Sequence, residues 1–402
     1  MRPIPAPMST ARRARRVATL VTCAVVLLSC HRGATVAPAL PDLEPLQPLP
    51  SALYGAQLPE QLDDSTFWRM VREFSEPGGY FQSENFVSNE MGLQHVITEL
   101  ERHAPPGGVY VGVGPEQNFT YLGTLRPRIA FIVDIRRQNL LQHLWYKAVF
   151  ELSPTRAEFL SRLFARPGIA GTARELSADS LITLLDLAPV DTAMFRRVFE
   201  DARRHLVVRH GFTLDSTDLA TMRYVDSIFV ASGPTLNYSS GSTGRMRGGF
   251  NRMPTFAQIV SATDERGVNR GYLGSEATYA VVRDLQRRNL IVPVVGNFAG
   301  PKALRAVGDW LRIRGARVNV FYTSNVEQYL FGDNLWSQFY GNVGAMPVDS
   351  SSRFIRSATN RPYGGASGFL MTQLTSSILE VVRGAQTGTV RDYRDVISLS
   401  RP

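Results

Sequence analysis

The chain has 402 residues, of which 44% are hydrophobic and 20% charged, and its formal net charge at pH 7 is +9. Five of its arginines lie among residues 1–16, so the remainder carries only about +4 and has no dense Lys/Arg run, which argues against a nucleic-acid partner. The only two cysteines are Cys23 and Cys30. The chain beyond Cys30 therefore excludes disulfides, cysteine nucleophiles and thiolate metal sites.

The N-terminus is typical of an export signal. Residues 1–16 are cationic, residues 17–28 are almost entirely apolar, and Ser29 precedes Cys30. This order of a basic region, a short apolar region and a small residue is that of a signal peptide. About 12 apolar residues span only about 18 Å as a helix, against about 30 Å of membrane hydrocarbon, so no permanent transmembrane helix is expected here.

The Leu-Leu-Ser-Cys sequence that ends at Cys30 resembles the bacterial lipobox. The resemblance implies cleavage before Cys30, acylation of this cysteine, and a lipoprotein held on a membrane of the cell envelope, facing the periplasm or on the outer membrane. The alternative is an ordinary secretory cleavage site with an incidental cysteine. Residues 1–29 are thus expected to be a signal peptide, and the proline-rich residues 30–57 an extended tether.

From residue 58 the composition is that of a globular domain. Hydrophobic spacing predicts helices over residues 64–74, 90–103, 118–125, 138–152, 155–164, 276–288 and 301–314. Short apolar runs predict strands over residues 108–114, 129–135, 225–231, 290–297 and 317–323.

This alternation of strands and helices favours an α/β fold with a mostly parallel sheet. We expect a Rossmann-like, doubly wound sheet within residues 58–360, with helical elements at its N-terminal end. A helical insertion is expected at about 171–222. Residues 361–402 are expected to form a less regular C-terminal segment.

A glycine bend follows the first predicted strand. Gly112 and Gly114 end this strand, and Asp134 ends the next one, twenty residues after Gly114. In nucleotide-binding α/β folds, such glycines let the backbone approach the ligand, and an acid ending the second strand accepts hydrogen bonds from ribose. The alternative is structural: the glycines form a tight turn, and Asp134 caps the following helix.

This segment resembles the class I S-adenosylmethionine-dependent methyltransferases, with the first motif at residues 109–114, the acid at Asp134, and a fourth-strand loop at Ser232-Gly233-Pro234. The resemblance implies S-adenosylmethionine as the cofactor. The residues that it places at the cofactor are Gly112, Gly114, Glu116, Asn118, Asp134 and Ile135. The chain departs from the family's pattern at Glu116, which stands where a third glycine is usual, and its first strand lacks the usual acidic residue.

Four longer strings resemble an uncharacterised bacterial lipoprotein family with a methyltransferase-like core. They are GGYFQSENFVSNE at 78–90, VGVGPEQNFTYL at 111–122, FIVDIRRQNLLQHLWYKAVFELS at 131–153 and FYTSNVEQYLF at 321–331. The resemblance covers most of the chain from residue 58 to about 342.

Residues near the ends of predicted elements are candidates for the rest of a ligand pocket. They are Ser83, Asn85, Asn89, Gly233, Asn297, Tyr322, Ser324, Asn325 and Glu327. Several have an equally good structural interpretation. Ser88 or Asn89 could cap one helix that has an acid in its first turn, and Ser324 or Asn325 could cap another with Glu327 as partner.

The charged and metal-ligating residues give weaker signals. Arg136 and Arg137 could neutralise a phosphate or a carboxylate, although such a pair more often lies on the solvated surface. The six histidines show no metal-ligand spacing, since even His205 and His210 are five apart, and no metal site is expected.

Three functions remain open. The first is methyl transfer from S-adenosylmethionine to an unknown acceptor, which requires an in-line approach but no particular catalytic residue. The second is binding of another nucleoside-like or small ligand by a methyltransferase-like domain, and the third is a module for envelope partners. S-adenosylmethionine is a cytosolic metabolite whereas the body of a lipoprotein normally faces outward, so fold and localisation favour different functions.

Overall fold

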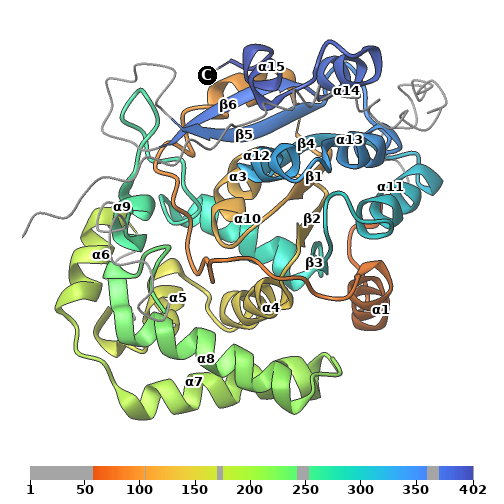
Figure 1. Ribbon diagram of the computed structural model, residues 1–402. Coiled ribbons are helices and arrows are strands. Elements are labelled where there is room, and N and C mark those ends of the chain that lie inside the picture. The colour runs from red at the N-terminus through yellow and green to blue at the C-terminus, as the bar shows by residue number, and fades with distance from the viewer. Residues whose placement is uncertain (1–57, 105, 170–174, 242–252, 360–370, 402) are drawn as a thin grey trace, which may run out of the picture. The chain divides into compact units, whose positions relative to one another are not determined.

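The computed structural model in Figure 1 describes residues 58–104, 106–169, 175–241, 253–359 and 371–401. The predicted signal peptide, the tether and Cys30 lie outside these residues. Among the residues described, no helix combines the length and the apolar character needed to cross a membrane.

A six-stranded sheet forms the centre of the fold, in the order β3-β2-β1-β4-β5-β6. Its first five strands are parallel, and β6 pairs antiparallel with β5. The strands are β1 (Val109–Gly112), β2 (Ile129–Asp134), β3 (Ile291–Val295), β4 (Val318–Ser324), β5 (Arg353–Thr359) and β6 (Met371–Ser377). The predicted α/β class and mostly parallel sheet are confirmed, and the strand order is compatible with a Rossmann-like fold.

The central strands are continuous apolar runs because helices cover both of their faces. Every residue of β1, β2 and β3 is buried, as expected for parallel strands between two helical layers. The chain builds β1, β2 and β3 outward in one direction and then returns to place β4 beside β1. The carboxyl ends of β1 and β4 therefore meet at the point where the strand order reverses, which is where open α/β sheets bind ligands.

Two layers of helices pack on the sheet (Figure 1). One layer contains α3 (Gln117–Leu125), α4 (Arg137–Glu151) and α10 (Glu276–Arg287). The other contains α1 (Asp64–Phe74), α11 (Ala303–Ile313), α13 (Trp336–Gly344) and α14 (Ile378–Thr387). The shorter helices α2 (Ile97–His103), α12 (Val326–Gly332) and α15 (Tyr393–Ser398) lie beside α3, β4 and α12, respectively.

Aromatic rings fill the interior on both sides of the sheet. In the first layer, the Phe119 ring centroid lies 5.2 Å from that of Tyr146 and 5.2 Å from that of Phe150. In the second, Phe298 lies 5.1 Å from Phe321 and stacks on Phe339. Such pairs add to the stability that comes from burying their area.

A helical segment lies between α4 and α10. Its elements are α5 (Arg156–Leu163), η2 (Pro167–Ile169), α6 (Ala178–Leu187), α7 (Thr192–Arg204), η3 (His205–Arg209), α8 (Ser216–Ser232), η4 (Gly233–Thr235) and α9 (Phe256–Ser261). Helices α5, α7 and α8 pack on α4. The predicted insertion at about 171–222 falls within this segment.

The strand predicted over residues 225–231 is wrong, because these residues belong to α8. The isolated string VDSIFVA is rich in β-branched and aromatic residues, but its neighbours continue a helical pattern. Asp218, Met222, Val225 and Phe229 are all buried, three or four residues apart, on one face of α8. Asp215 starts the helix with a capping box to Asp218.

Two further elements differ from the prediction. The helix expected over residues 90–103 begins only at Ile97, because Glu90 is buried and binds side chains of other segments rather than occupying a first helical turn. The C-terminal part is more regular than expected. It contributes β6 to the edge of the sheet and α14 to the second helical layer.

Candidate functional site

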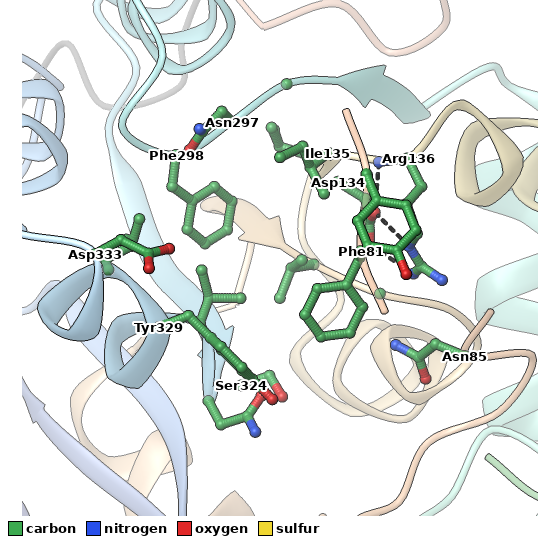
Figure 2. A pocket seen from close by; sticks show the side chains of 18 of the residues that line it. Phe81, Asn85, Asp134, Ile135, Arg136, Asn297, Phe298, Ser324, Tyr329 and Asp333 are labelled. Atoms are coloured by element: carbon green, nitrogen blue, oxygen red, sulfur yellow. Dashed lines mark hydrogen bonds and ion pairs between the residues drawn. The ribbon is translucent and has the colours of Figure 1, made fainter. Parts of the chain in front are cut away.

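A cavity of about 210 Å³ lies at the carboxyl ends of β1, β2, β3 and β4 (Figure 2). The residues that end or follow these strands and line it include Val113, Gly114, Asp134, Ile135, Gly296, Asn297, Ser324 and Asn325. The parallel sheet explains this convergence, since all four carboxyl ends meet at one edge. The glycine bend and Asp134 thus share one cavity.

The walls of the cavity are aromatic and amide-rich. Rings come from Tyr80, Phe81, Tyr238, Phe298 and Tyr329, and side-chain amides from Asn85, Asn89, Gln117, Asn297 and Asn325. Phe81 and Tyr329 meet edge to face with centroids 5.4 Å apart, and Figure 2 shows both rings beside the cavity. An apolar lining with a few placed polar groups is typical of small-molecule sites.

The bend that forms one wall requires glycine at two positions. Gly114 has φ +78°, in the left-handed region, and a Cβ on Gly112 would lie 2.1 Å from Oδ1 of Asn118. Nδ2 of Asn118 donates to the carbonyls of Val113, Gly114 and Pro115 at 3.0, 3.1 and 2.8 Å. Asn118 therefore holds the bend from behind and does not line the cavity.

His143 fixes the same bend from α4. Its Nε2 lies 2.9 Å from the Gly114 carbonyl oxygen. Burial lowers the pKa of His143 to about 4, so the ring is neutral near pH 7 and donates this hydrogen bond. The carbonyl of Gly114 is thus occupied by protein donors.

Asp134 is already paired (Figure 2). Its Oδ1 accepts from the backbone N–H and Nε of Arg136, at 2.9 and 3.0 Å, and its Oδ2 accepts from Nη2 at 3.0 Å. Nη1 of Arg136 donates to the carbonyls of Ser83 and Glu84. Arg136 is buried rather than on the solvated surface. One acceptor position remains on Oδ2, and one N–H remains on the guanidinium.

Arg137 has a different role from its neighbour. Its Nε and Nη2 donate to the carboxylate of Asp218 on α8 at 2.7 and 2.6 Å. The pKa of Arg137 is raised, mainly by this hydrogen bond. Arg137 thus ties the helical segment to the start of α4 and is absent from the cavity.

Glu90 is a buried carboxyl group next to the cavity. It accepts from Oγ of Ser324 at 2.5 Å, from the Tyr322 hydroxyl at 2.8 Å and from Nε2 of Gln373 at 2.8 Å. Burial raises its pKa. Tyr322 is turned toward Glu90 and does not line the cavity. Ser324, two residues further along β4, does line it.

Glu116 supports the loop before β1 rather than a ligand. Its Oε1 accepts from the backbone N–H of Ser88 at 3.0 Å, and the side chain is buried outside the cavity. Burial raises the pKa of Glu116 to about 8. Near neutral pH this carboxyl group is largely protonated, so it does not place a full negative charge near the glycine bend.

Glu327 lies on the side of β4 opposite to Glu90. Its carboxylate accepts from Nε and Nη2 of Arg356 at 2.7 and 3.1 Å, and from the Tyr340 hydroxyl at 2.8 Å. Both charged side chains are fully buried. Glu327 is therefore part of a structural ion pair, and it neither caps α12 nor lines the cavity.

The structure divides the predicted site residues into two groups. Those that line the cavity are Gly114, Asp134, Ile135, Asn85, Asn89, Asn297, Ser324 and Asn325. Those that do not are Gly112, Glu116, Asn118, Ser83, Gly233, Tyr322 and Glu327.

The predicted fourth-strand loop at Gly233 is wrong, because Gly233 follows α8 and lies against Arg166. Ser83 lies outside the lining, and its carbonyl accepts a hydrogen bond from Arg136, which is part of the lining.

Several lining residues were missed by the sequence reasoning. Tyr80 and Phe81 lie in one of the strings that resemble the bacterial lipoprotein family, and Tyr329 lies in another, so these strings carried a signal for them. Tyr238 and Asp333 had none, since they follow no predicted strand. The described residues also bring Glu151, His205 and His210 together, although their spacing gave no metal signal.

A family model described as "Domain of unknown function (DUF7790)" matches residues 85–216 and 246–382, which is more than half of the chain. Both matched parts contribute to the cavity, since the first contains Gly114 and Asp134 and the second Asn297 and Ser324. No curated protein matches the chain.

The ion pair of Glu327 predicts a large loss of stability. Glu327→Gln leaves the buried Arg356 charge without its partner, which should lower the free energy of unfolding by about 3–5 kcal/mol, measured by urea denaturation. The control is Asp309→Asn, which removes an exposed pair with Arg312 and should cost less than about 1 kcal/mol. Equal stability of the two variants would contradict a structural role for Glu327.

The pKa of Glu116 predicts a pH dependence of stability. Its folded value of about 8 exceeds the ordinary 4.5, so the folded state holds a proton that the unfolded state loses between these values. This contribution is complete below about pH 4.5 and is lost as the pH rises through about 8. Glu116→Gln should remove it, giving a flatter curve of unfolding free energy against pH. Glu200→Gln, at an exposed carboxylate that pairs with Arg203, should leave the wild-type slope.

Proposed function

This chain belongs to the family of the domain of unknown function DUF7790, and on that premise we propose that its cavity binds a small nucleoside-like molecule, with S-adenosylmethionine as the leading candidate. One observation carries the proposal: Gly114 and Asp134 line the same cavity, at the carboxyl ends of adjacent parallel strands. In such sheets, nucleoside ligands bind where a glycine bend after one strand lets the backbone approach them and the neighbouring strand ends in an acidic residue.

The lining supports a ligand with a flat ring and a polar part. Phe81, Phe298 and Tyr329 offer ring faces and edges against which a purine would pack. The free acceptor position on Oδ2 of Asp134 suits one ribose hydroxyl, and the amides of Asn85 and Asn297 can each donate and accept hydrogen bonds.

Methyl transfer would be the reaction if the ligand is S-adenosylmethionine. The sequence resemblance to class I methyltransferases suggests it, and the chemistry needs only that an acceptor reach the methyl group in line. Tyr80 and Tyr329 are 86% and 38% exposed at the cavity rim, so this side is open to an acceptor. No described side chain is assigned as a catalytic base.

A second function is favoured by the pairing of Asp134 with Arg136. Because the two charges neutralise each other and use most of their hydrogen-bonding capacity, the cavity offers less to ribose than an unpaired acid would. This observation favours a ligand-binding or envelope interaction module without methyl transfer. The two functions share the cavity and differ in the ligand.

We also propose that the protein is an exported lipoprotein whose membrane partner is lipid, attached at Cys30. The basic and apolar zones and the Leu-Leu-Ser-Cys sequence support this proposal. The body of the protein would then face the periplasm or lie on the outer membrane, and S-adenosylmethionine would have to reach it there.

Binding is tested by thermal shift with S-adenosylmethionine and S-adenosylhomocysteine. A ligand at 100 times its Kd should add about 2.7 kcal/mol to the free energy of unfolding. Tyr329→Ala should weaken binding by about 1–3 kcal/mol, or roughly 5- to 150-fold, because a base would lose a stacking partner.

The matched control is Tyr224→Ala, which removes a tyrosine of similar exposure, 37%, that does not line the cavity. Equal losses in both variants would show that binding occurs elsewhere. No shift with either compound at millimolar concentration would reject the methyltransferase proposal and leave the second function.

Lipidation is tested by metabolic labelling with palmitate and by detergent phase separation in a bacterial host. Wild-type protein should incorporate label and enter the detergent phase, whereas Cys30→Ala should do neither, since an acyl chain is the source of membrane affinity. Cys23→Ala, within the apolar zone, should behave as wild type. Labelling of the Cys30→Ala protein would exclude Cys30 as the lipidated residue.

A further inference from the structure

Three potential metal ligands meet at the end of α4 that is remote from the cavity. Nε2 of His205 lies 2.7 Å from Oε2 of Glu151, and Nε2 of His210 lies 2.9 Å from the same oxygen. One donor atom from each residue lies within 4.8 Å of the other two. The cavity is at the start of this 15-residue helix, about 20 Å away.

A π-turn explains why two histidines five residues apart share a side. Side chains five apart on an α-helix point about 140° away from each other. Here α7 continues into η3, whose i→i+5 hydrogen bond joins the backbone N–H of His210 to the carbonyl of His205 at 3.0 Å. The ring centroids are 4.8 Å apart. Such turns interrupt helices frequently at functional sites.

Asp64 orients one of these rings. Its Oδ1 lies 2.6 Å from Nδ1 of His210 and also accepts from Nδ2 of Asn289 at 2.8 Å. Phe212 stacks on the same ring. A carboxylate at one imidazole nitrogen places the proton there and leaves the other nitrogen as a lone pair for a metal, which is the usual outer arrangement of a histidine ligand.

The donor atoms around Oε2 of Glu151 converge as the ligands of a cation would. Nδ1 of His210 faces Asp64 and its Nε2 faces Glu151, so the nitrogen on the Glu151 side is the one placed to bind an ion. His205 approaches the same Oε2 of Glu151 as well. A metal ion between the three donors would accept both imidazole lone pairs and the carboxylate, with Nδ1 of His210 donating to Asp64.

Neighbouring charges leave one carboxylate oxygen for this role. Nζ of Lys147 donates to Oε1 of Glu151 and to the Gln286 carbonyl, both at 2.6 Å, so Oε2 is the oxygen that faces the histidines. Arg209 lies 3.8 Å from the far oxygen of Asp64. Lys147 and Arg209 thus balance the charges of Glu151 and Asp64.

The two separations between the histidine nitrogens and Oε2 of Glu151 need only a small expansion to take an ion. Around a tetrahedral ion with ligands at about 2.0–2.1 Å, donor atoms lie about 3.3 Å apart, compared with 2.7 and 2.9 Å here. Access exists, because a surface hollow lined by Asp64, Trp68 and His210 reaches the cluster.

We propose that Glu151, His205 and His210 bind a divalent transition-metal ion, with zinc as the expected metal and water in the fourth position. Two imidazoles and a carboxylate are ligands that zinc prefers. The ion ties η3 to α4 and, through Asp64, to α1. It stabilises the attachment of the helical segment to the α/β core, independently of any ligand in the cavity.

Titration of the metal-stripped full chain with Zn²⁺ tests this proposal by calorimetry and thermal shift, with Co²⁺ absorption reporting the ligand geometry. We expect one ion per chain, a raised Tm and the visible spectrum of four-coordinate Co²⁺. Asp64→Asn should weaken binding about 10- to 100-fold, and His205→Gln and His210→Gln should weaken it more. His103→Gln, which alters a histidine that pairs with Glu99 on exposed α2, should bind as wild type.

Equal Zn²⁺ affinity in wild type, His205→Gln and His210→Gln would overturn the proposal, as would the absence of any Zn²⁺-dependent rise in Tm. If His210→Gln does not fold, His205→Gln decides, because His205 makes a single contact with Glu151 and its side chain is 19% exposed. Binding that is lost equally in His103→Gln would also overturn it.

Discussion

The bend between β1 and α3 is the constraint on which the cavity depends. A strand buried on both faces has to turn into a buried helix within a few residues, and the carbonyls of Val113, Gly114 and Pro115 would be left without partners in the interior. Asn118 donates to all three, and neutral His143 adds a donor to Gly114. With the bend fixed in this way, Gly114 faces the cavity, and residues at the ends of β2, β3 and β4 form its other walls.

Most of the charge at and around the cavity is paired, and Asp333 adds an exposed carboxylate to the lining. Asp134 is matched by Arg136, and on the far side of β4 Glu327 is matched by Arg356. Glu90 and Glu116 have no cationic partner among the residues that the structure describes, and burial raises the pKa of both. A ligand would therefore be recognised mainly by aromatic surface and by neutral amides, which suits an uncharged ring better than a phosphate.

Helix α4 connects the cavity with the proposed metal site. Its first residues follow Asp134 and Arg136 at the cavity, and its last residue, Glu151, faces His205 and His210. The helical segment packs along the length of α4, so an ion at Glu151 would hold that segment in place without contacting the cavity. The geometry separates the cavity on the parallel sheet from the proposed metal site beneath the helical segment.

The sequence by itself determined the features that depend on neighbouring residues. The apolar strands, the glycine bend and the acid that ends β2 could be predicted because each is encoded within one short stretch, and Gly114 and Asp134 do line one cavity.

Side-chain direction was decided by the tertiary structure: the pleat turns Tyr322 toward Glu90 and Thr323 toward Glu327 on opposite sides of β4. Residues 225–231 became α8 because their flanking residues, and the surface of α4 on which they pack, favour a helix. Tyr238 reached the cavity, and His205 and His210 reached Glu151, only through the folding together of distant segments and one π-turn, which no local spacing encodes.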